Sequence, residues 1–271
     1  VYKRQFIDNA GDEISRARYS ATQERSLGLG AMGWHSLLHQ KRIPFDSFEA
    51  RELNHRVFKY IKQEAVKESN SMGFERGEAP DMQGTGRRNA HLLAIAPNAN
   101  SSIICGTSPS IEPAKANAYT HRTRAGSHLV KNKYLEQELK KVKQNTQDVW
   151  SSIITNGGSV QHLDFLSQKV KDVFKTAIEL DQLVLVEQGA DRQEYLCQGQ
   201  SLNLFFPAGA DKKDLHRAHF AAWKLGTKGL YYLRTETSQR AENVSLKVAR
   251  DALKDFETQA MTQDECVACQ G

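Results

Sequence analysis

The sequence predicts an α/β fold in which short buried strands alternate with amphipathic helices. Several stretches of the 271-residue chain repeat apolar residues at a spacing of three and four, as amphipathic helices do. Apolar or aromatic runs that are too short for helices separate these stretches. Such alternation is typical of α/β domains, in which helices cover a mixed or parallel sheet.

The N-terminal half contains two predicted helices, a loop and a strand. Residues 26–39 and 47–69 show helical apolar spacing, and Pro44 separates them. Gly, Glu, Pro and Arg dominate residues 73–88, which are therefore expected to form a loop. Residues 90–96 are apolar but too few for a helix, so we expect a buried strand there.

Three further helices and two strands are predicted in the C-terminal half. Helical spacing covers residues 134–149, 163–188 and 213–225, and Gly226 suits the C-cap of the last helix. The predicted strands are residues 201–206 and, by aromatic content, 229–235. The following residues, 236–271, are mostly polar and charged and are expected to form a flexible tail.

Composition excludes several classes of protein. The formal net charge is only +5, and the basic residues are scattered among 32 acidic ones, so no nucleic-acid partner is expected. No apolar run approaches the roughly 18 residues of a membrane span, and the N-terminus lacks the apolar stretch of a secretory signal. We therefore expect a cytoplasmic protein that does not contact a membrane.

Gly28, Gly30 and Gly33 have the spacing of a dinucleotide-binding fingerprint. That fingerprint follows a hydrophobic strand, whereas residues 19–26 here are mostly polar. Close helix packing on small residues is therefore the favoured interpretation. A nicotinamide-dependent oxidoreductase remains an alternative function.

A polar turn follows the predicted strand at residues 90–96. It consists of Pro97, Asn98, Ala99, Asn100 and Ser101, and a helix could begin there. Asn and Ser are strong N-caps, and free backbone N–H groups at such a turn can bind a phosphate or another anion. An ordinary capped helix without a ligand is the simpler interpretation of the chemistry alone.

Tyr231 and Tyr232 are adjacent in a predicted strand, so regular alternation would point them to opposite faces of the sheet. They can be ordinary strand aromatics. They can also be a redox pair, because a phenol that loses a proton and an electron together can relay a radical. Their rings would stack only if the backbone departed from regular strand geometry.

The four cysteines are unevenly distributed: Cys105 and Cys197 stand alone, whereas Cys266 and Cys269 form a pair at the end of the chain. No second pair at ligand spacing accompanies them, so a zinc site is not expected. A dithiol on a flexible tail suits thiol–disulfide exchange, and about 30 flexible residues reach roughly 30 Å. A non-catalytic thiol or metal-binding adaptor is the other alternative.

Five stretches, in this order, resemble the C-terminal part of the large subunit of class I ribonucleotide reductases. They are Arg-Ser-Leu-Gly-Leu-Gly at 25–30, Arg-Asn at 88–89 with Ala-Ile-Ala-Pro-Asn-Ala-Asn-Ser-Ser at 94–102, Ser-Ile-Glu-Pro at 110–113, Leu-Tyr-Tyr at 230–232 with Thr235, and the terminal cysteine pair. The resemblance implies that residues 1–235 form the later strands of a ten-stranded α/β barrel and that residues 236–271 form a flexible redox tail.

The resemblance also implies a role for each candidate site residue. The turn Pro97, Asn98, Ala99, Asn100 and Ser101 would hold the diphosphate of a ribonucleoside diphosphate substrate. Tyr231 and Tyr232 would relay a radical that arrives from the small subunit. Cys266 and Cys269 would re-reduce the active-site disulfide, and thioredoxin or glutaredoxin would supply the electrons.

The family's radical cysteine lies in an Asn-Leu-Cys-x-Glu loop, and this sequence contains no such segment. Both Cys105 and Cys197 are therefore expected to be structural. We expect this portion to bind no cofactor or metal itself, with a diiron-tyrosyl radical in the small subunit. Activity would require a separate N-terminal portion of the large subunit, as a split gene would provide; a truncated sequence is the alternative.

Overall fold

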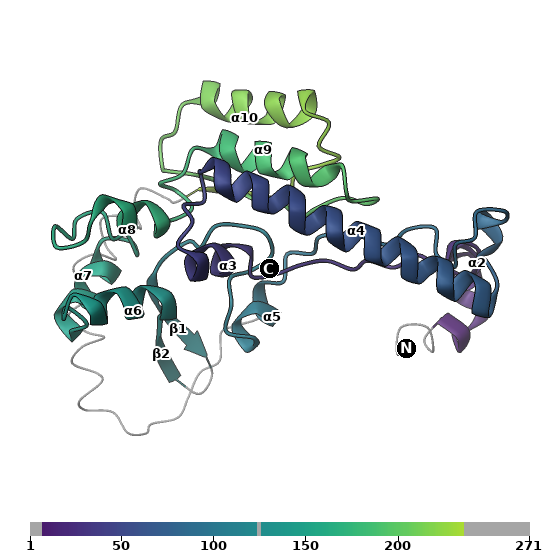
Figure 1. Ribbon diagram of the computed structural model, residues 1–271, viewed down its shortest axis with the longest axis horizontal. Coiled ribbons are helices and arrows are strands. Elements are labelled where there is room, and N and C mark those ends of the chain that lie inside the picture. Colours follow the sequence, from purple (N-terminus) through teal and green to yellow (C-terminus); the bar gives the residue numbers. More distant parts are fainter. Residues whose placement is uncertain (1–6, 124–125, 236–271) are drawn as a thin grey trace.

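The computed structural model describes residues 7–123 and 126–235 (Figure 1). Its centre is a set of parallel extended segments separated by helices. Leu29 bridges Leu93 and Ile95 bridges Gln200, both in parallel. Strand β3 (Leu204–Phe206) then pairs in parallel with β4 (Leu233–Thr235). The expected α/β fold is confirmed.

The first helix prediction was too long. A 3₁₀ turn (Asp12–Ile14) and α2 (Ser15–Glu24) lie where no helix was predicted, and α3 covers only Trp34–Lys41. Residues 26–30 are extended instead, because their backbone pairs with the strand at 91–94: Leu27 N–H donates to His91 O at 2.9 Å. Tertiary pairing therefore overrides the helical spacing of these residues.

Helix α4 (Phe48–Arg76) confirms the second predicted helix and continues beyond it. Ser47 caps its N-terminus, because the Ser47 side chain accepts a hydrogen bond from Ala50 N–H. The helix extends past residue 69, and at Gly73 it packs closely against the following loop. A Cβ added at Gly73 would lie only 2.1 Å from Gly86 O, so this contact requires glycine. The predicted loop therefore begins only after Arg76 and contains a short 3₁₀ turn, Pro80–Met82.

Residues 118–173 form a lobe beside the sheet (Figure 1). An unpredicted antiparallel hairpin opens it, with strands β1 (Ala118–Thr123) and β2 (Gly126–Lys131). Helices and hairpin share a core that includes Leu135, Leu139, Trp150 and Ile153. The helices are α6 (Lys133–Lys141), α7 (Gln147–Thr155) and α8 (Gln168–Val173).

Two predicted helices are interrupted in the structure. The pattern at 134–149 is split between α6 and α7, because Lys143 adopts a positive φ of 57° and Thr146 caps a new helix. The pattern at 163–188 is split between α8 and α9 (Gln182–Gln193), and the Asp181 side chain caps α9 by accepting from Leu183 N–H. Apolar spacing persisted across both breaks, whereas the caps set the boundaries.

The last helix, α10 (Lys212–Lys224), agrees with its prediction to within a residue at each end. Gly226 follows it with a φ of 77°, so the expected C-cap glycine is confirmed. Figure 1 shows α4, α9 and α10 stacked over the parallel segments. Strands β3 and β4 are shorter than predicted, because residues 201–203 and 229–232 are extended without regular pairing.

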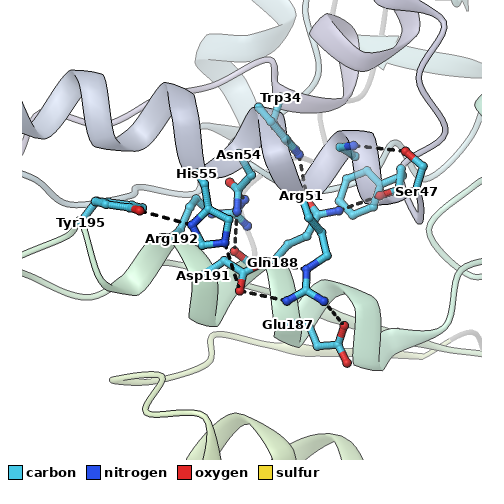
Figure 2. Close-up of polar contacts among 12 residues, drawn as sticks. Trp34, Ser47, Arg51, Asn54, His55, Glu187, Gln188, Asp191, Arg192 and Tyr195 are labelled. Carbon is cyan, nitrogen blue, oxygen red and sulfur yellow. Dashed lines mark hydrogen bonds and ion pairs between the residues drawn. The ribbon is translucent and has the colours of Figure 1, made fainter.

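A buried polar network fixes α9 against α4 (Figure 2). Arg192 is fully buried, its Nη1 donates to Asn54 Oδ1 at 2.7 Å, and burial lowers its pKa to about 9. Asn54 Nδ2 in turn donates to Gln188 O at 3.0 Å. The Gln188 amide accepts from Trp34 Nε1 and donates to Phe45 O. These contacts connect α3, α4 and α9 into one support for the sheet.

Charged side chains extend this network toward the surface (Figure 2). Arg51 donates from Nε and Nη2 to both carboxylate oxygens of Asp191, at 2.8 and 3.0 Å, and from Nη1 to Glu187 at 3.1 Å. His55 lies within 3.3 Å of the Tyr195 hydroxyl. A two-pronged guanidinium–carboxylate pair holds a defined geometry, so α4 and α9 are fixed in register.

Candidate functional site

The candidate phosphate turn lies directly beyond the buried extended segment at residues 91–95. Asn98 adopts a left-handed conformation with a φ of 53°, and helix α5 (Ala99–Ile104) begins immediately after it. Ala99, Asn100 and Ser101 are exposed. N–H groups in the first turn of a helix have no partner within that helix, so the turn presents exposed donors of the kind that bind anions. The expected helix start is confirmed, whereas phosphate binding stays a prediction.

The glycine-rich segment has a structural role. A Cβ on Gly30 would lie 2.3 Å from Ala94 O, so only glycine permits this approach of two backbones. A Cβ on Gly28 would lie 3.5 Å from the Ala94 side chain, an ordinary contact. The favoured idea of close packing is therefore right, although the packing joins extended segments and not helices.

The N-terminus of α3 is already occupied by contacts within the chain. Gly33 N–H donates to Ser108 O at 2.9 Å, and Trp34 N–H donates to Ser110 O at 3.3 Å. Ser36 N–H donates to the Ser108 hydroxyl at 3.0 Å. A dinucleotide-binding helix needs these groups for a pyrophosphate. The structure therefore gives no support to a nicotinamide-dependent oxidoreductase.

Tyr231 and Tyr232 lie side by side, with ring centroids 4.1 Å apart and an angle of 52° between the ring planes. Tyr231 N–H donates to Leu202 O, so a regular parallel ladder would place Tyr231 O against Leu204 N–H. Leu204 N–H instead donates to Tyr232 O at 3.0 Å. Tyr232 is thus an extra residue, a bulge, and the bulge turns both rings the same way.

The tyrosine rings are partly exposed, Tyr231 at 46% and Tyr232 at 51%. A hydrogen bond with the Tyr232 side chain raises the pKa of the Tyr231 phenol. The Arg234 guanidinium lies 4.6 Å from the Tyr232 ring centroid. The expectation that regular alternation separates the two rings is therefore wrong: a departure from regular strand geometry brings them side by side, tilted and not stacked.

The turn follows the extended segment that contains Ile95, whereas Tyr231 and Tyr232 immediately precede β4. Ile95, two residues before the turn, pairs with Gln200, and three residues further along that segment Asn203 contacts Tyr232 N–H. In parallel α/β sheets, ligands bind outside the carboxyl ends of the strands. The turn therefore lies where such sheets bind ligands.

The cysteines have different surroundings. Cys197 Sγ accepts hydrogen bonds from Leu92 N–H and Leu93 N–H at 3.0 and 3.1 Å, a structural role. Cys105 is exposed at the end of α5. The redox candidates Cys266 and Cys269 lie outside the described residues. Residues 7–123 and 126–235 contain no group of three potential metal ligands.

Sequence reasoning missed two residues of this site. Glu112 is buried, and its carboxylate binds Asn203, whose side chain contacts Tyr232. Glu112 lies in the Ser-Ile-Glu-Pro stretch, which served only as a point of resemblance. A carboxylate between the apolar Ile111 and Pro113 was the only signal in the sequence, and it did not show that the charge is buried or which residue it binds.

Together, the parallel extended segments and the helices between them define an α/β protein. The family model described as "Ribonucleotide reductase, barrel domain" matches residues 4–86 and 81–233. The chain therefore belongs to the ribonucleotide reductase barrel family.

Individual relatives agree with this assignment. A Frog virus 3 protein provisionally named ribonucleoside-diphosphate reductase large subunit is 51% identical over 269 residues, which cover 98% of this chain and 46% of the relative. The large subunit of Invertebrate iridescent virus 6 is 47% identical over 89% of this chain and 26% of the relative. The class Id ribonucleotide reductase alpha subunit of Actinobacillus ureae superimposes with a TM-score of 0.81 at 38% identity, covering 89% of this chain and 45% of that one.

The chain thus spans less than half the length of these curated relatives. In the part of the chain that the structure describes, no helix is long and apolar enough to cross a membrane.

Proposed function

We propose that this chain forms the C-terminal part of a ribonucleoside-diphosphate reductase large subunit, which reduces ribonucleotides to deoxyribonucleotides. The contact between the two tyrosine rings carries the proposal. The two phenol rings have centroids 4.1 Å apart, close enough to pass a proton and an electron between them. A bulge just before β4 produces this contact. Ordinary strand aromatics at adjacent positions would lie on opposite faces.

The polar turn supports a nucleoside diphosphate as substrate. Ala99, Asn100 and Ser101 present backbone N–H groups at a helix start, and no acidic residue occurs between Pro97 and Ser102 to repel a phosphate. We assign Pro97 and Asn98 to the same site, because the left-handed Asn98 turns the chain into α5. The turn would hold the diphosphate while the sugar reacts elsewhere in the site.

The radical would reach Tyr231 and Tyr232 from a small subunit that carries a diiron-tyrosyl radical. Each phenol would give up one proton and one electron and later recover both, so neither tyrosine is consumed. Their partial exposure supports contact with a second subunit. No cofactor is assigned to this portion of the large subunit.

Residues 236–271 are proposed as a separate redox tail, and residues 1–235 as the barrel portion. The family match ends at residue 233, close to this boundary, which supports the division. Cys266 and Cys269 would reduce the active-site disulfide by thiol–disulfide exchange, and thioredoxin or glutaredoxin would then reduce the tail.

The N-terminal portion of the large subunit is the remaining proposed partner, and it would supply the radical cysteine. Leu27 and Leu29 support this partner, because they lie on the outermost of the parallel segments and are 48% and 54% exposed. Exposed apolar residues on an edge segment favour association with another sheet. The reductase would therefore act in the cytoplasm only as a complex.

Reconstitution tests this proposal. The chain alone, even with a small subunit and a reductant, should reduce no nucleotide, and adding an N-terminal portion from a related large subunit should produce turnover. In that complex, Tyr231→Phe and Tyr232→Phe should each abolish turnover, because a phenyl ring has no acidic proton and is hard to oxidise. Each change removes one hydroxyl, so stability should fall by no more than about 1 kcal/mol. Folded Phe variants with near-normal turnover would contradict the proposal.

A further inference from the structure

Glu112 is a buried carboxylate that binds the strand segment beside the tyrosine pair. Its exposed fraction is 3%. One carboxylate oxygen accepts from Asn203 N–H at 2.7 Å, and the other accepts from Asn203 Nδ2 at 3.1 Å. A carboxylate removed from water is tolerated only with such partners. Asn203 therefore satisfies both oxygens of Glu112.

Asn203 makes a third hydrogen bond, which reaches the tyrosine pair. Its side-chain Oδ1 accepts from Tyr232 N–H at 3.0 Å. Tyr232 is the extra residue of the bulge, so its N–H has no place in the ladder between the two strands. Asn203 supplies the acceptor that this N–H would otherwise lack.

The carboxylate determines which way the Asn203 amide points. An ionised carboxylate only accepts hydrogen bonds, so the NH₂ end of the amide must face Glu112. The oxygen end is then left for Tyr232 N–H. A reversed amide would place the Asn203 side-chain oxygen against the Glu112 carboxylate. It would also place the Asn203 NH₂ group against Tyr232 N–H.

Charges near the tyrosines fit the same arrangement. Burial raises the pKa of Glu112, whereas the bonds from Asn203 and the positive charges of Lys115 and Arg234 oppose that effect. Burial, and then the charge of Arg234, lower the pKa of Lys115. Glu112 therefore interacts electrostatically with two cations, one of which, Arg234, lies over the ring of Tyr232.

We propose that Glu112 and Asn203 are positioning residues that hold the bulge and thereby keep the rings of Tyr231 and Tyr232 side by side. The functional part of this inference rests on the proposed radical relay. The positioning itself is a matter of hydrogen-bond geometry, and it can be measured without turnover.

An exchange of amide and carboxylate tests the proposal. Glu112→Gln places an NH₂ group against the NH₂ group of Asn203, and Asn203→Asp places two carboxylates together. Each single change therefore disturbs the acceptor for Tyr232 N–H. The double variant E112Q/N203D can make all three hydrogen bonds, with donor and acceptor exchanged only in the bond between the two side chains, and it keeps the same net charge. Asn117→Asp is the matched control, because Asn117 is also buried and its side chain also forms hydrogen bonds through both the amide nitrogen and the amide oxygen, far along the sequence from the tyrosines.

Two measurements are made on the complex of this chain with the N-terminal portion and the small subunit. Ring contact is followed by nuclear Overhauser effects between ring-labelled tyrosines, and turnover is followed with a ribonucleoside diphosphate. Each single variant should lose the contact between the rings and should lower kcat by about tenfold or more, with KM unchanged. The double variant should recover both to within about threefold of the original protein. The Asn117→Asp control should lower the melting temperature but keep the ring contact.

Retained ring contact and kcat in both single variants would overturn the proposal. So would a double variant that is unfolded or as impaired as the single ones, because its hydrogen bonds should be equivalent to the original set. Failure of the proposed function gives a different pattern. The unmodified complex would then be inactive, or Tyr232→Phe would remain active, while the ring contacts would still show whether Glu112 and Asn203 position the pair.

Discussion

Replacing Gly30 with alanine should destabilise the chain, whereas the same change at Gly28 should not. The added Cβ at Gly30 would lie 2.3 Å from Ala94 O, well inside the 3.4–4 Å of ordinary contact. Neither partner is the end of a flexible side chain, so the two backbones must separate by roughly 1 Å to reach normal contact distances. The added Cβ at Gly28 would lie 3.5 Å from the Ala94 side chain and needs no movement.

Separation at Gly30 would break the nearest backbone hydrogen bonds. Leu29 N–H donates to Leu92 O at 2.8 Å, and Ala94 N–H donates to Leu29 O at 3.0 Å. At about 1 kcal/mol each, their loss costs about 2 kcal/mol. The lower entropy of an unfolded chain with alanine returns about 0.4–1 kcal/mol at either glycine. We therefore expect a net loss of about 1–2 kcal/mol for Gly30→Ala and no loss, or a slight gain, for Gly28→Ala.

Urea denaturation followed by circular dichroism measures both variants under the same conditions. The difference between them should be about 2 kcal/mol, which appears as a lower midpoint for Gly30→Ala. Equal stability would refute the steric argument. Equal destabilisation would also refute it, because a dinucleotide fingerprint would require both glycines, whereas backbone packing requires only Gly30.

Three further predictions concern histidines and cysteines. Burial lowers the pKa of His35 and lowers that of His39 to about 3, so both side chains stay neutral in the folded protein, whereas both take up protons in the unfolded chain below about pH 6.5. The free energy of unfolding should therefore fall by about 2 kcal/mol for each histidine between pH 7 and pH 5. A urea midpoint that is the same at pH 7 and pH 5 would contradict this prediction. Cys197→Ala leaves two backbone N–H groups without an acceptor and should lower the free energy of unfolding by about 1–3 kcal/mol, as measured by thermal denaturation. Cys197→Ser keeps an acceptor and should retain most of that stability. Equal losses of stability in the two variants would argue against a role for the hydrogen bonds. In the reconstituted complex, Cys266→Ser or Cys269→Ser should abolish repeated turnover with thioredoxin but keep turnover with a small dithiol. Loss of turnover with both reductants would indicate that the cysteine pair is structural.

Local sequence patterns determined much of the fold. The apolar spacing of residues 47–69 and 213–225 predicted α4 and α10, because helical neighbours three and four residues apart depend on nothing distant. Gly226 was identified as a cap for the same reason, since its positive φ is a local requirement. The family, too, was indicated by short motifs and their order along the chain, which are properties of the sequence alone.

Tertiary contacts decided what local patterns could not. Residues 26–30 have helical spacing, yet their backbone pairs with residues 91–94, a contact invisible to any short window. The divisions of 134–149 and 163–188 depended on Thr146 and Asp181 acting as caps within patterns that continued across them. Competition between local preference and long-range pairing is resolved only when the segments meet.

For the candidate site, the sequence determined the residue types and the structure decided their geometry. Adjacent tyrosines were evident from the sequence, but alternation placed them on opposite faces. Their contact depends on one extra residue just before a strand that pairs with an earlier segment, as the register of Leu204 with Leu233 shows. It also depends on Glu112, which is distant in sequence from both tyrosines. The alignment of two strands and the burial of a charge are properties of the folded chain, so only the tertiary structure could reveal them.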